Sequence, residues 1–147
     1  MTFGIVECPP MAPPSGKGFV GLVIVSHSAA LASGLVELVA QVAGPDVPIV
    51  TAAGGPDGTL GTDGGRVLEA LRTVDGAGAV ILADLGSSLL SVKAALAELS
   101  AAQAERIVLA DAPLVEGAIA AGVTASTGAS LAEVAVAAEE ARSVTKL

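Results

Sequence analysis

The chain has almost no aromatic side chains: it lacks tryptophan and tyrosine, and its only phenylalanines are Phe3 and Phe19. Proteins that bind single-stranded nucleic acid usually stack bases on aromatic rings. A formal net charge of -8 over 147 residues also opposes binding to a phosphate backbone. We therefore expect no nucleic-acid partner, and a core of Ala, Val, Leu and Ile.

Cysteine and histidine are equally scarce, with Cys8 and His27 the only examples of each. A single cysteine forms no intrachain disulfide, which fits a reducing cytoplasm, where we place the protein. One histidine and one cysteine supply no ligand cluster for zinc, so we expect neither a metal nor another cofactor. Gly, Ser and Pro interrupt the uncharged stretches, which are too mixed to span a bilayer.

The chain divides into a short leader and one domain. Residues 1–18 contain four prolines without apolar periodicity, and they lack the long apolar segment of a signal peptide. They are predicted to form a flexible Pro/Gly-rich leader. A length of 147 residues is typical of one domain, which we assign to residues 19–147.

Strand and helix patterns alternate through this domain. Short apolar runs predict strands at 19–25, 47–52, 79–83 and 106–110. Helices are predicted from the cap Ser28 to Ala43, after Thr62 or Asp63, after residues 86–88, at 114–123, and from the cap Ser130 through 131–144. This order is typical of an α/β fold: a doubly wound open sheet of about four parallel strands, with helices on both faces.

Two helices carry more apolar residues than a simple surface helix. Helical spacing puts one apolar face on the first helix, formed by Leu31, Leu35, Leu38, Val39 and Val42. The segment 131–144 is also rich in Ala, Leu and Val, so we expect an apolar neighbour for it. Open sheet edges are normally covered as well, and a two-fold homodimer would meet both needs.

Polar residues collect where the predicted strands end. The carboxyl ends of parallel strands meet at one edge, where α/β proteins bind ligands. His27 follows the first strand, and an imidazole nitrogen is a good nucleophile near neutral pH. Asp84 follows the third strand and could hold the histidine in one tautomer. A hydrogen-bonded structural histidine and a solvated or capping aspartate are the alternatives.

The residues after Asp84 could hold an anion. Gly86, Ser87 and Ser88 open a predicted helix and offer free backbone N–H groups and two hydroxyls. Ordinary helix capping by serine is the alternative. Asp111 is a weaker candidate, because an aspartate near a proline commonly begins a turn. The chain lacks a G-x-S-x-G elbow, a P-loop and a strand followed by G-x-G-x-x-G.

Four motifs carry a family resemblance: Val23-Ile24-Val25-Ser26-His27-Ser28, Gly61-Thr62-Asp63, Asp84-Leu85-Gly86-Ser87-Ser88-Leu89-Leu90-Ser91 and Ala112-Pro113-Leu114-Val115-Glu116-Gly117. In this order they resemble the phosphocarrier subunit of phosphoenolpyruvate-dependent dihydroxyacetone kinase. That subunit is similar to the mannose-class enzyme IIA domains of the bacterial phosphotransferase system. The resemblance covers the chain from about Gly21 to its last helix.

The resemblance implies a phosphohistidine carrier. His27 would take phosphate from HPr and pass it to ADP on the nucleotide-binding kinase subunit, which would phosphorylate dihydroxyacetone on a third subunit. Asp84 would orient the ring, and Ser28, Thr62, Gly86, Ser87 and Ser88 would bind phosphate. The resemblance also implies a homodimer. Because some relatives carry HPr-like and enzyme I-like domains after this one and this chain stops at Leu147, we expect a donor in trans.

Two alternative functions share the predicted fold. One is the enzyme IIA domain of a mannose-type sugar transporter, and the other is a non-catalytic regulatory binding module. The loop after Asp84 lacks the second glycine and the proline of mannose-class domains, which favours the kinase branch. The four loops hold no Lys or Arg, so hydroxyls and N–H groups would hold the phosphate. Apolar residues around His27, with Leu85, Leu89 and Leu114 as candidates, would dock the protein partners.

Overall fold

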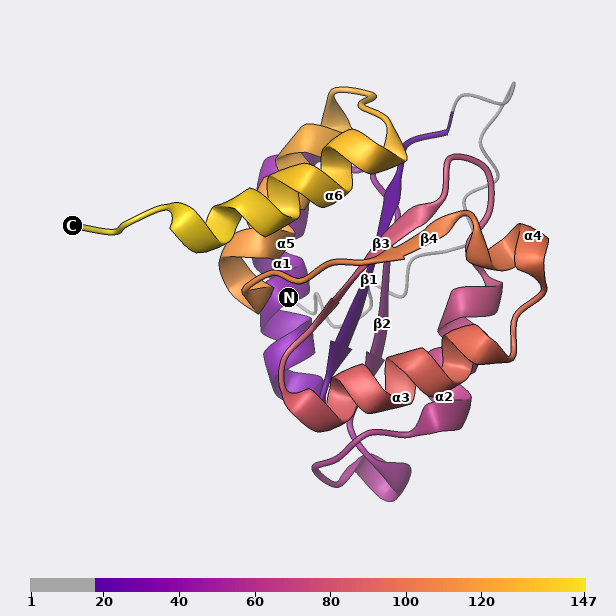
Figure 1. Ribbon diagram of the computed structural model, residues 1–147. Helices are drawn as coiled ribbons and strands as arrows, with labels where there is room; N and C mark the ends of the chain where they lie inside the picture. The colour runs from indigo at the N-terminus through magenta and orange to yellow at the C-terminus, as the bar shows by residue number, and fades with distance from the viewer. Residues whose placement is uncertain (1–17) are drawn as a thin grey trace.

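The computed structural model describes residues 18–147, in which four parallel strands form one sheet. The strands are β1 (Gly21–Ser26), β2 (Ile49–Ala53), β3 (Ala79–Ala83) and β4 (Ile107–Leu109). Their order across the sheet is β2-β1-β3-β4 (Figure 1). Leu22 pairs with Ile49 on one side and with Val80 on the other, so β1 and β3 lie at the centre. All four predicted strands are confirmed. The leader predicted for residues 1–18 lies, apart from Gly18, outside the described residues.

The helices follow the predicted alternation closely. They are α1 (Ala29–Ala43), α2 (Gly64–Arg72), α3 (Gly86–Ala97), α4 (Ala101–Ala104), α5 (Leu114–Ser126) and α6 (Leu131–Glu140), with single 3-10 turns at Pro56–Gly58 and Ala141–Ser143. Ser28, Asp63 and Ser130 cap α1, α2 and α6 through their side chains. The short α4 was not predicted, because four residues are too few for an apolar period.

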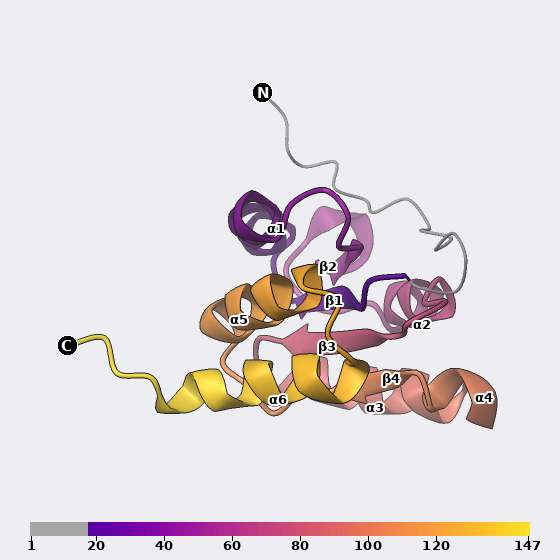
Figure 2. The same cartoon turned by 90° about the horizontal axis from the view of Figure 1, so that it is seen from above.

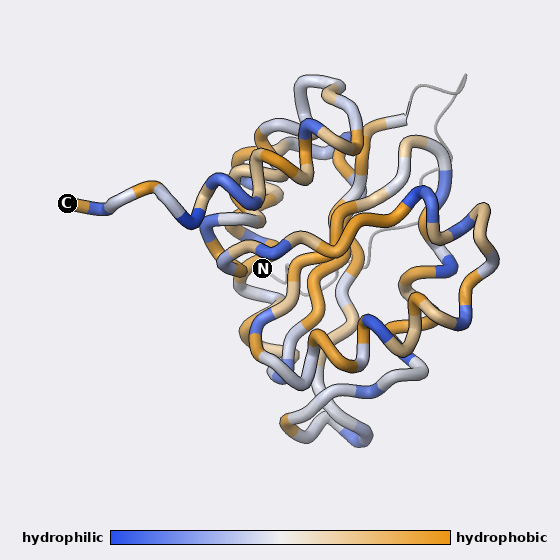
Figure 3. The backbone as a smooth tube through the Cα atoms, in the orientation of Figure 1, coloured by the Kyte–Doolittle hydropathy of each residue, from blue (hydrophilic) through white to orange (hydrophobic). Residues whose placement is uncertain are grey.

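Helices cover both faces of the sheet, as predicted (Figure 2). Side chains alternate along each strand, so Leu22 and Ile24 face the layer of α1, α5 and α6, whereas Val23 and Val25 face α2 and α3. Figure 3 shows that the most hydrophobic segments coincide with the central strands. Gly122 brings α5 close to α1, because a Cβ there would lie 2.7 Å from a Val39 methyl group. The fold is the predicted three-layer α/β arrangement.

The predicted apolar face of α1 is only partly buried. Leu35 and Val39 lie in the core, but Leu31, Leu38 and Val42 are 45%, 54% and 47% exposed. Small residues complete the buried face, which comprises Ala32, Leu35, Val36, Val39 and Ala43. The apolar arc of α1 is therefore wider than the surface that the sheet and α5 cover.

The last helix has the apolar neighbour that was expected, but it differs from the prediction in its end and in where that neighbour comes from. The α-helix ends at Glu140 rather than at Val144, and a 3-10 turn follows it. Its apolar face already has a neighbour, because Val134 and Ala138 are fully buried in the core beside α5 of the same chain. This helix therefore gives no support to a homodimer. Within residues 18–147, no helix is long and apolar enough to cross a membrane.

Candidate functional site

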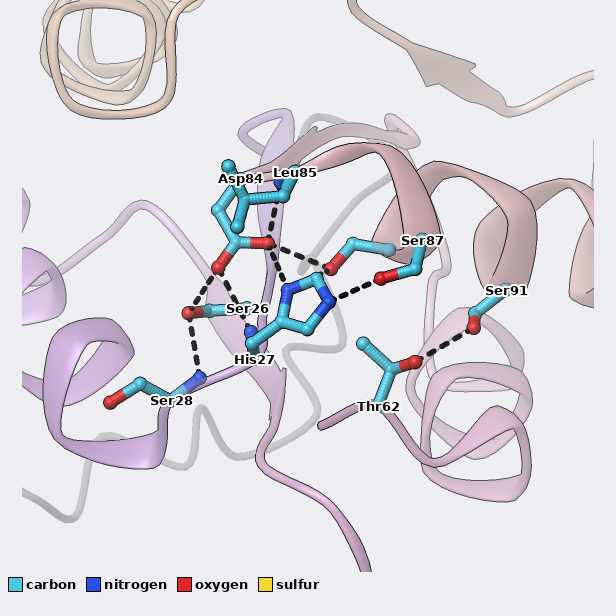
Figure 4. A network of polar contacts seen from close by, with 9 residues as sticks. Ser26, His27, Ser28, Thr62, Asp84, Leu85, Ser87 and Ser91 are labelled. Carbon is cyan, nitrogen blue, oxygen red and sulfur yellow. Dashed lines mark hydrogen bonds and ion pairs between the residues drawn. The ribbon is translucent and has the colours of Figure 1, made fainter. Parts of the chain in front are cut away.

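The site forms where the two central strands end. His27 follows β1, and Asp84 follows β3, the neighbouring strand in the sheet. The order β2-β1-β3-β4 brings together two residues that are 57 positions apart in the sequence. Figure 4 shows the two side chains facing each other, as the convergence of strand ends predicts.

Asp84 is the centre of the hydrogen-bond network. One oxygen, Oδ1, accepts from His27 Nδ1 at 2.9 Å, from Ser88 Oγ at 2.7 Å and from the Leu85 N–H at 2.7 Å. The other, Oδ2, accepts from Ser26 Oγ and from the His27 N–H, each at 2.9 Å. With five donors around it, this carboxylate is locked in position and ionised.

The electrostatics of Asp84 follow from these contacts. Its side chain is only 11% exposed, and burial by itself raises the pKa of a carboxyl group. The hydrogen bonds from the His27 N–H, the Ser88 hydroxyl, the His27 ring and the Ser26 hydroxyl together outweigh burial and hold the pKa of Asp84 far below its usual value. Asp84 is therefore a negative charge beside the imidazole at neutral pH.

The network assigns one tautomer to His27. Because the ionised Asp84 has no proton to give, Nδ1 carries the hydrogen and donates to Oδ1. Nε2 then holds a lone pair, which accepts a hydrogen bond from the Ser87 hydroxyl. The His27 side chain is 24% exposed. The ring nitrogen that holds the lone pair is thus Nε2, and it faces Ser87 at the α3 N-terminus.

Ser26 is a buried part of the network that the sequence did not single out. Its side chain is fully buried, and its hydroxyl donates to Asp84 Oδ2 and accepts from the Ser28 N–H at 3.1 Å. Strand alternation suggests only that this position is buried, and a hydroxyl in a strand gives no signal of its partner. Its position next to His27 is the one clue that the sequence offers.

The residues predicted to bind phosphate lie at different positions relative to the His27 ring. Ser87 contacts Nε2, and Gly86 opens α3, whose first two N–H groups make no hydrogen bond within residues 18–147. Ser88 is fully buried on the carboxylate side, with its hydroxyl 3.1 Å from Nδ1. Ser28 caps α1 by accepting from the Leu31 N–H. Thr62 lies near the ring but pairs with Ser91 Oγ at 3.0 Å (Figure 4).

Asp111, the weakest candidate, takes part in a separate cluster. Its carboxylate pairs with Arg142 at 3.2 Å, and its N–H donates to Glu139 at 3.0 Å. These contacts attach the loop after β4 to the end of α6. Asp111 therefore contacts α6 and the turn that follows it, and it has no contact with the His27 network.

Exposed leucines lie in the segments that carry the site. Leu85 and Leu90 are 63% and 70% exposed, and Leu60, in the loop after β2, is 80% exposed. Leu89 is also exposed, whereas Leu114 packs partly buried against the core. Among the described residues, no group of three His, Cys, Asp or Glu side chains could hold a metal ion. The arrangement is a half-buried imidazole held by an ionised carboxylate, with exposed leucines in the surrounding segments.

Comparison with known proteins identifies the family. Residues 21–135 match the EIIA-man family, described as the PTS system fructose IIA component. The chain belongs to the EIIA-man family. The crystal structure of the unknown function protein EF1359 is similar to this chain, with a TM-score of 0.74 and 32% sequence identity. The match covers 82% of this chain and 93% of that one. The predicted mannose-class IIA-like fold is confirmed by both comparisons.

Several curated relatives are subunits of one kinase system. The EIIA-man chain is 46% identical over 126 residues to the phosphoryl donor subunit DhaM of a PEP-dependent dihydroxyacetone kinase from Providencia stuartii, covering 83% of this chain and 26% of that protein. The Escherichia coli subunit of the same name is 41% identical over 78% of this chain and 25% of its own length. The chain thus spans about a quarter of these relatives. A Listeria innocua DhaM subunit is 36% identical over 71% of this chain and 84% of its own length. The predicted resemblance to this group is confirmed.

Proposed function

We propose that this EIIA-man domain is the phosphoryl donor subunit of a dihydroxyacetone kinase and carries the phosphoryl group on His27 Nε2. The observation that carries the proposal is the assigned tautomer, in which Asp84 holds Nδ1–H and the Nε2 lone pair is occupied only by the Ser87 hydroxyl. The similarity to DhaM subunits supports the choice of kinase.

Phosphoryl transfer to His27 forms one bond and breaks one. The Nε2 lone pair attacks phosphorus of a phosphohistidine donor, for which we propose HPr, while the donor's N–P bond breaks and its electron pair returns to the donor ring. Ser87 must first leave the lone pair that its hydroxyl occupies. The His27 ring then gains positive charge on the side of Nδ1, where the ionised Asp84 stabilises it.

The α3 N-terminus supplies donors for the phosphoryl oxygens. The Ser87 hydroxyl contacts Nε2, and the free N–H groups of Gly86 and Ser87 begin the same helix. Within residues 18–147, no Lys or Arg side chain forms a hydrogen bond or ion pair with His27 or Ser87, and Arg66, on α2, donates to the Ala53 carbonyl instead. Neutral donors hold a phosphoryl group loosely enough for onward transfer.

Onward transfer reverses the first step. A phosphate oxygen of ADP on the nucleotide-binding kinase subunit attacks phosphorus, and the N–P electron pair returns to Nε2, which restores the tautomer held by Asp84. The exposed Leu60, Leu85 and Leu90 offer apolar contacts for docking these two partners in turn. We also propose a homodimer, on the basis of the family resemblance.

The test is phosphorylation of the purified chain by enzyme I, HPr and phosphoenolpyruvate. We expect one acid-labile phosphoryl group, located on His27 by mass spectrometry, and its transfer to ADP when the kinase subunits are added. No phosphorylation would favour a regulatory binding module. Phosphorylation that supports uptake of a sugar but not formation of dihydroxyacetone phosphate would favour a sugar-transport IIA domain.

A further inference from the structure

The loop between β2 and α2, residues 54–63, borders the site and has little packing of its own. Residues 56–60 are all exposed, and four of the residues from 54 to 61 are glycine. Glycine gives the backbone more conformational freedom than any other residue, and Gly61 has a φ of 136°, which other residues rarely adopt. The position of this loop therefore depends on its hydrogen bonds.

Two backbone hydrogen bonds attach the loop to the end of β1. The Gly54 N–H donates to the Ser26 carbonyl at 3.0 Å, and the Gly61 N–H donates to the His27 carbonyl at 2.9 Å. Both ends of the loop are thus attached to the strand that carries the imidazole. The hydrogen bonds of Thr59 stay within the loop. None of these contacts fixes the loop relative to α3.

A pair of hydroxyl groups attaches the loop to α3. Thr62 Oγ1 and Ser91 Oγ lie 3.0 Å apart, and the pair is partly buried (Figure 4). Within residues 18–147, no other hydrogen bond joins residues 54–63 to α3. Ser91 follows Ser87 by four residues, so both lie on one side of α3, and Ser87 is the residue that contacts His27 Nε2. The pair therefore fixes the loop relative to the helix that faces the imidazole.

Each hydroxyl of the pair lies close in the sequence to a strongly exposed leucine. Leu60, two residues before Thr62, is 80% exposed, and Leu90, directly before Ser91, is 70% exposed. A protein partner that docks on apolar side chains binds more tightly when the segments that carry them are already ordered. Fixing the loop against α3 therefore prepares an apolar surface for docking.

We propose that Thr62 is a positioning residue, which acts through Ser91 to hold the segment that carries Leu60 beside α3 for docking of the phosphohistidine donor. This role differs from the phosphate binding that the family resemblance implies for Thr62. Among the described residues, the Thr62 side chain has no hydrogen bond with His27 or Ser87. The inference rests on the proposed function, because it concerns the donor of that reaction.

Thr62→Val tests the inference, because valine has nearly the same shape and lacks the hydroxyl. The assay is the rate of phosphorylation at increasing concentrations of phosphorylated HPr. We expect the KM for HPr to rise by about 5-fold, the equivalent of one neutral hydrogen bond. The kcat should stay nearly unchanged, because His27 and Asp84 keep their contacts and the bound donor orders the loop.

Matched variants show whether the hydroxyl pair is responsible. Thr62→Ser keeps a hydroxyl and should retain the wild-type KM. Ser91→Ala should raise the KM as Thr62→Val does, and the two changes together should raise it no further, because each removes the same hydrogen bond. Thr127→Val is the control: the Thr127 hydroxyl donates to the Thr124 carbonyl at the end of α5, so its loss should leave the KM unchanged.

A further variant tests the part played by Leu60. Leu60→Ala should also raise the KM, and adding Thr62→Val in that background should have little further effect. Fully additive effects would show that Thr62 does not act through the segment of Leu60 and would overturn the inference. A lower kcat with an unchanged KM in Thr62→Val would show that Thr62 binds the phosphoryl group instead. Unchanged values of both would also overturn the inference.

Amide hydrogen exchange separates this inference from the proposed function. The Gly61 N–H should exchange faster in Thr62→Val than in the wild type, with or without phosphate on the chain. Equal exchange would refute the positioning of the loop even when phosphorylation proceeds. A wild-type chain that accepts no phosphate from HPr would refute the proposed function and with it the docking role, even when exchange shows that Thr62 fixes the loop.

Discussion

Replacing Asp84 by asparagine tests the role of the carboxylate most directly. Asparagine has nearly the same shape, so its carbonyl can stay at the Oδ1 position and accept from the ring, Ser88 and Leu85. Its amide NH2 group then takes the Oδ2 position, where the His27 N–H loses its acceptor. The Ser26 hydroxyl must rotate so that it accepts a hydrogen bond from this amide instead of donating one. The variant therefore loses a negative charge and about one buried hydrogen bond.

The magnitude can be worked out from these contacts. A hydrogen bond to a charged group is worth about 1.5–3 kcal/mol, and the charge on Asp84 matters most when the ring becomes positive. At about 1.4 kcal/mol for each factor of ten, phosphorylation should slow by roughly 10- to 150-fold. The unpaired His27 N–H should cost about 1–3 kcal/mol of folding stability, which leaves the domain folded.

Rapid-quench measurement of phosphoryl transfer from HPr is the assay, with circular dichroism and thermal unfolding as the check on folding. Asp111→Asn is a suitable control, because its carboxylate is 88% exposed and pairs with Arg142 away from the network. Transfer by the Asp84→Asn variant at nearly the wild-type rate would refute the proposed stabilisation of the ring.

Three further predictions concern the same network. His27→Ala and His27→Gln should fold but accept no phosphate, as mass spectrometry would show, and a phosphorylated variant would remove His27 from the reaction. Ser26→Ala should lower the free energy of unfolding by about 1–2 kcal/mol, measured by chemical denaturation, and should slow phosphoryl transfer. Ser26→Thr should retain most activity. Equal losses in the threonine and alanine variants would show that the hydroxyl is not the group that matters. Because the folded-state pKa of Asp84 is lowered, its stabilising effect is complete above its ordinary pKa of 3.8 and is lost as the pH falls below that value. Acid titration of unfolding should therefore show a steeper loss below about pH 4 for the wild type than for Asp84→Asn, and equal slopes would contradict the network.

The local pattern of the chain was enough to predict its elements. Apolar runs, Ser28, Asp63 and Ser130 as caps, and alternation of strand and helix all act over a few residues, so the sequence expresses them directly. That His27 and Asp84 lie at the same edge could also be predicted, because parallel strands bring their carboxyl ends to one edge, but their contact required β1 and β3 to be neighbours in the sheet.

Other features depended on how the elements pack. Helical spacing predicted one apolar face for α1, but the position of α5 and the sheet decided that Val36 and Ala43 are buried while Leu38 and Val42 are exposed. The same reasoning predicted that the last helix contacts another subunit, whereas α5 of the same chain already packs against α6. Periodicity gives the width of an apolar face and contains no information on which part of it finds a neighbour.

The sequence by itself determined which groups could do chemistry: one imidazole after the first strand, a carboxylate after the third strand and a run of hydroxyls at the start of α3. Only the tertiary structure decided which of these groups contact each other. Ser87 and Ser88 are adjacent in the chain, yet one faces Nε2 and the other is buried against Asp84, because successive residues of a helix point about 100° apart. The buried Ser26 is also part of the network only through the tertiary structure, because its partner Asp84 lies 58 residues away in the sequence. Hydrogen bonds between strands depend on register and distance, which the folded sheet alone establishes.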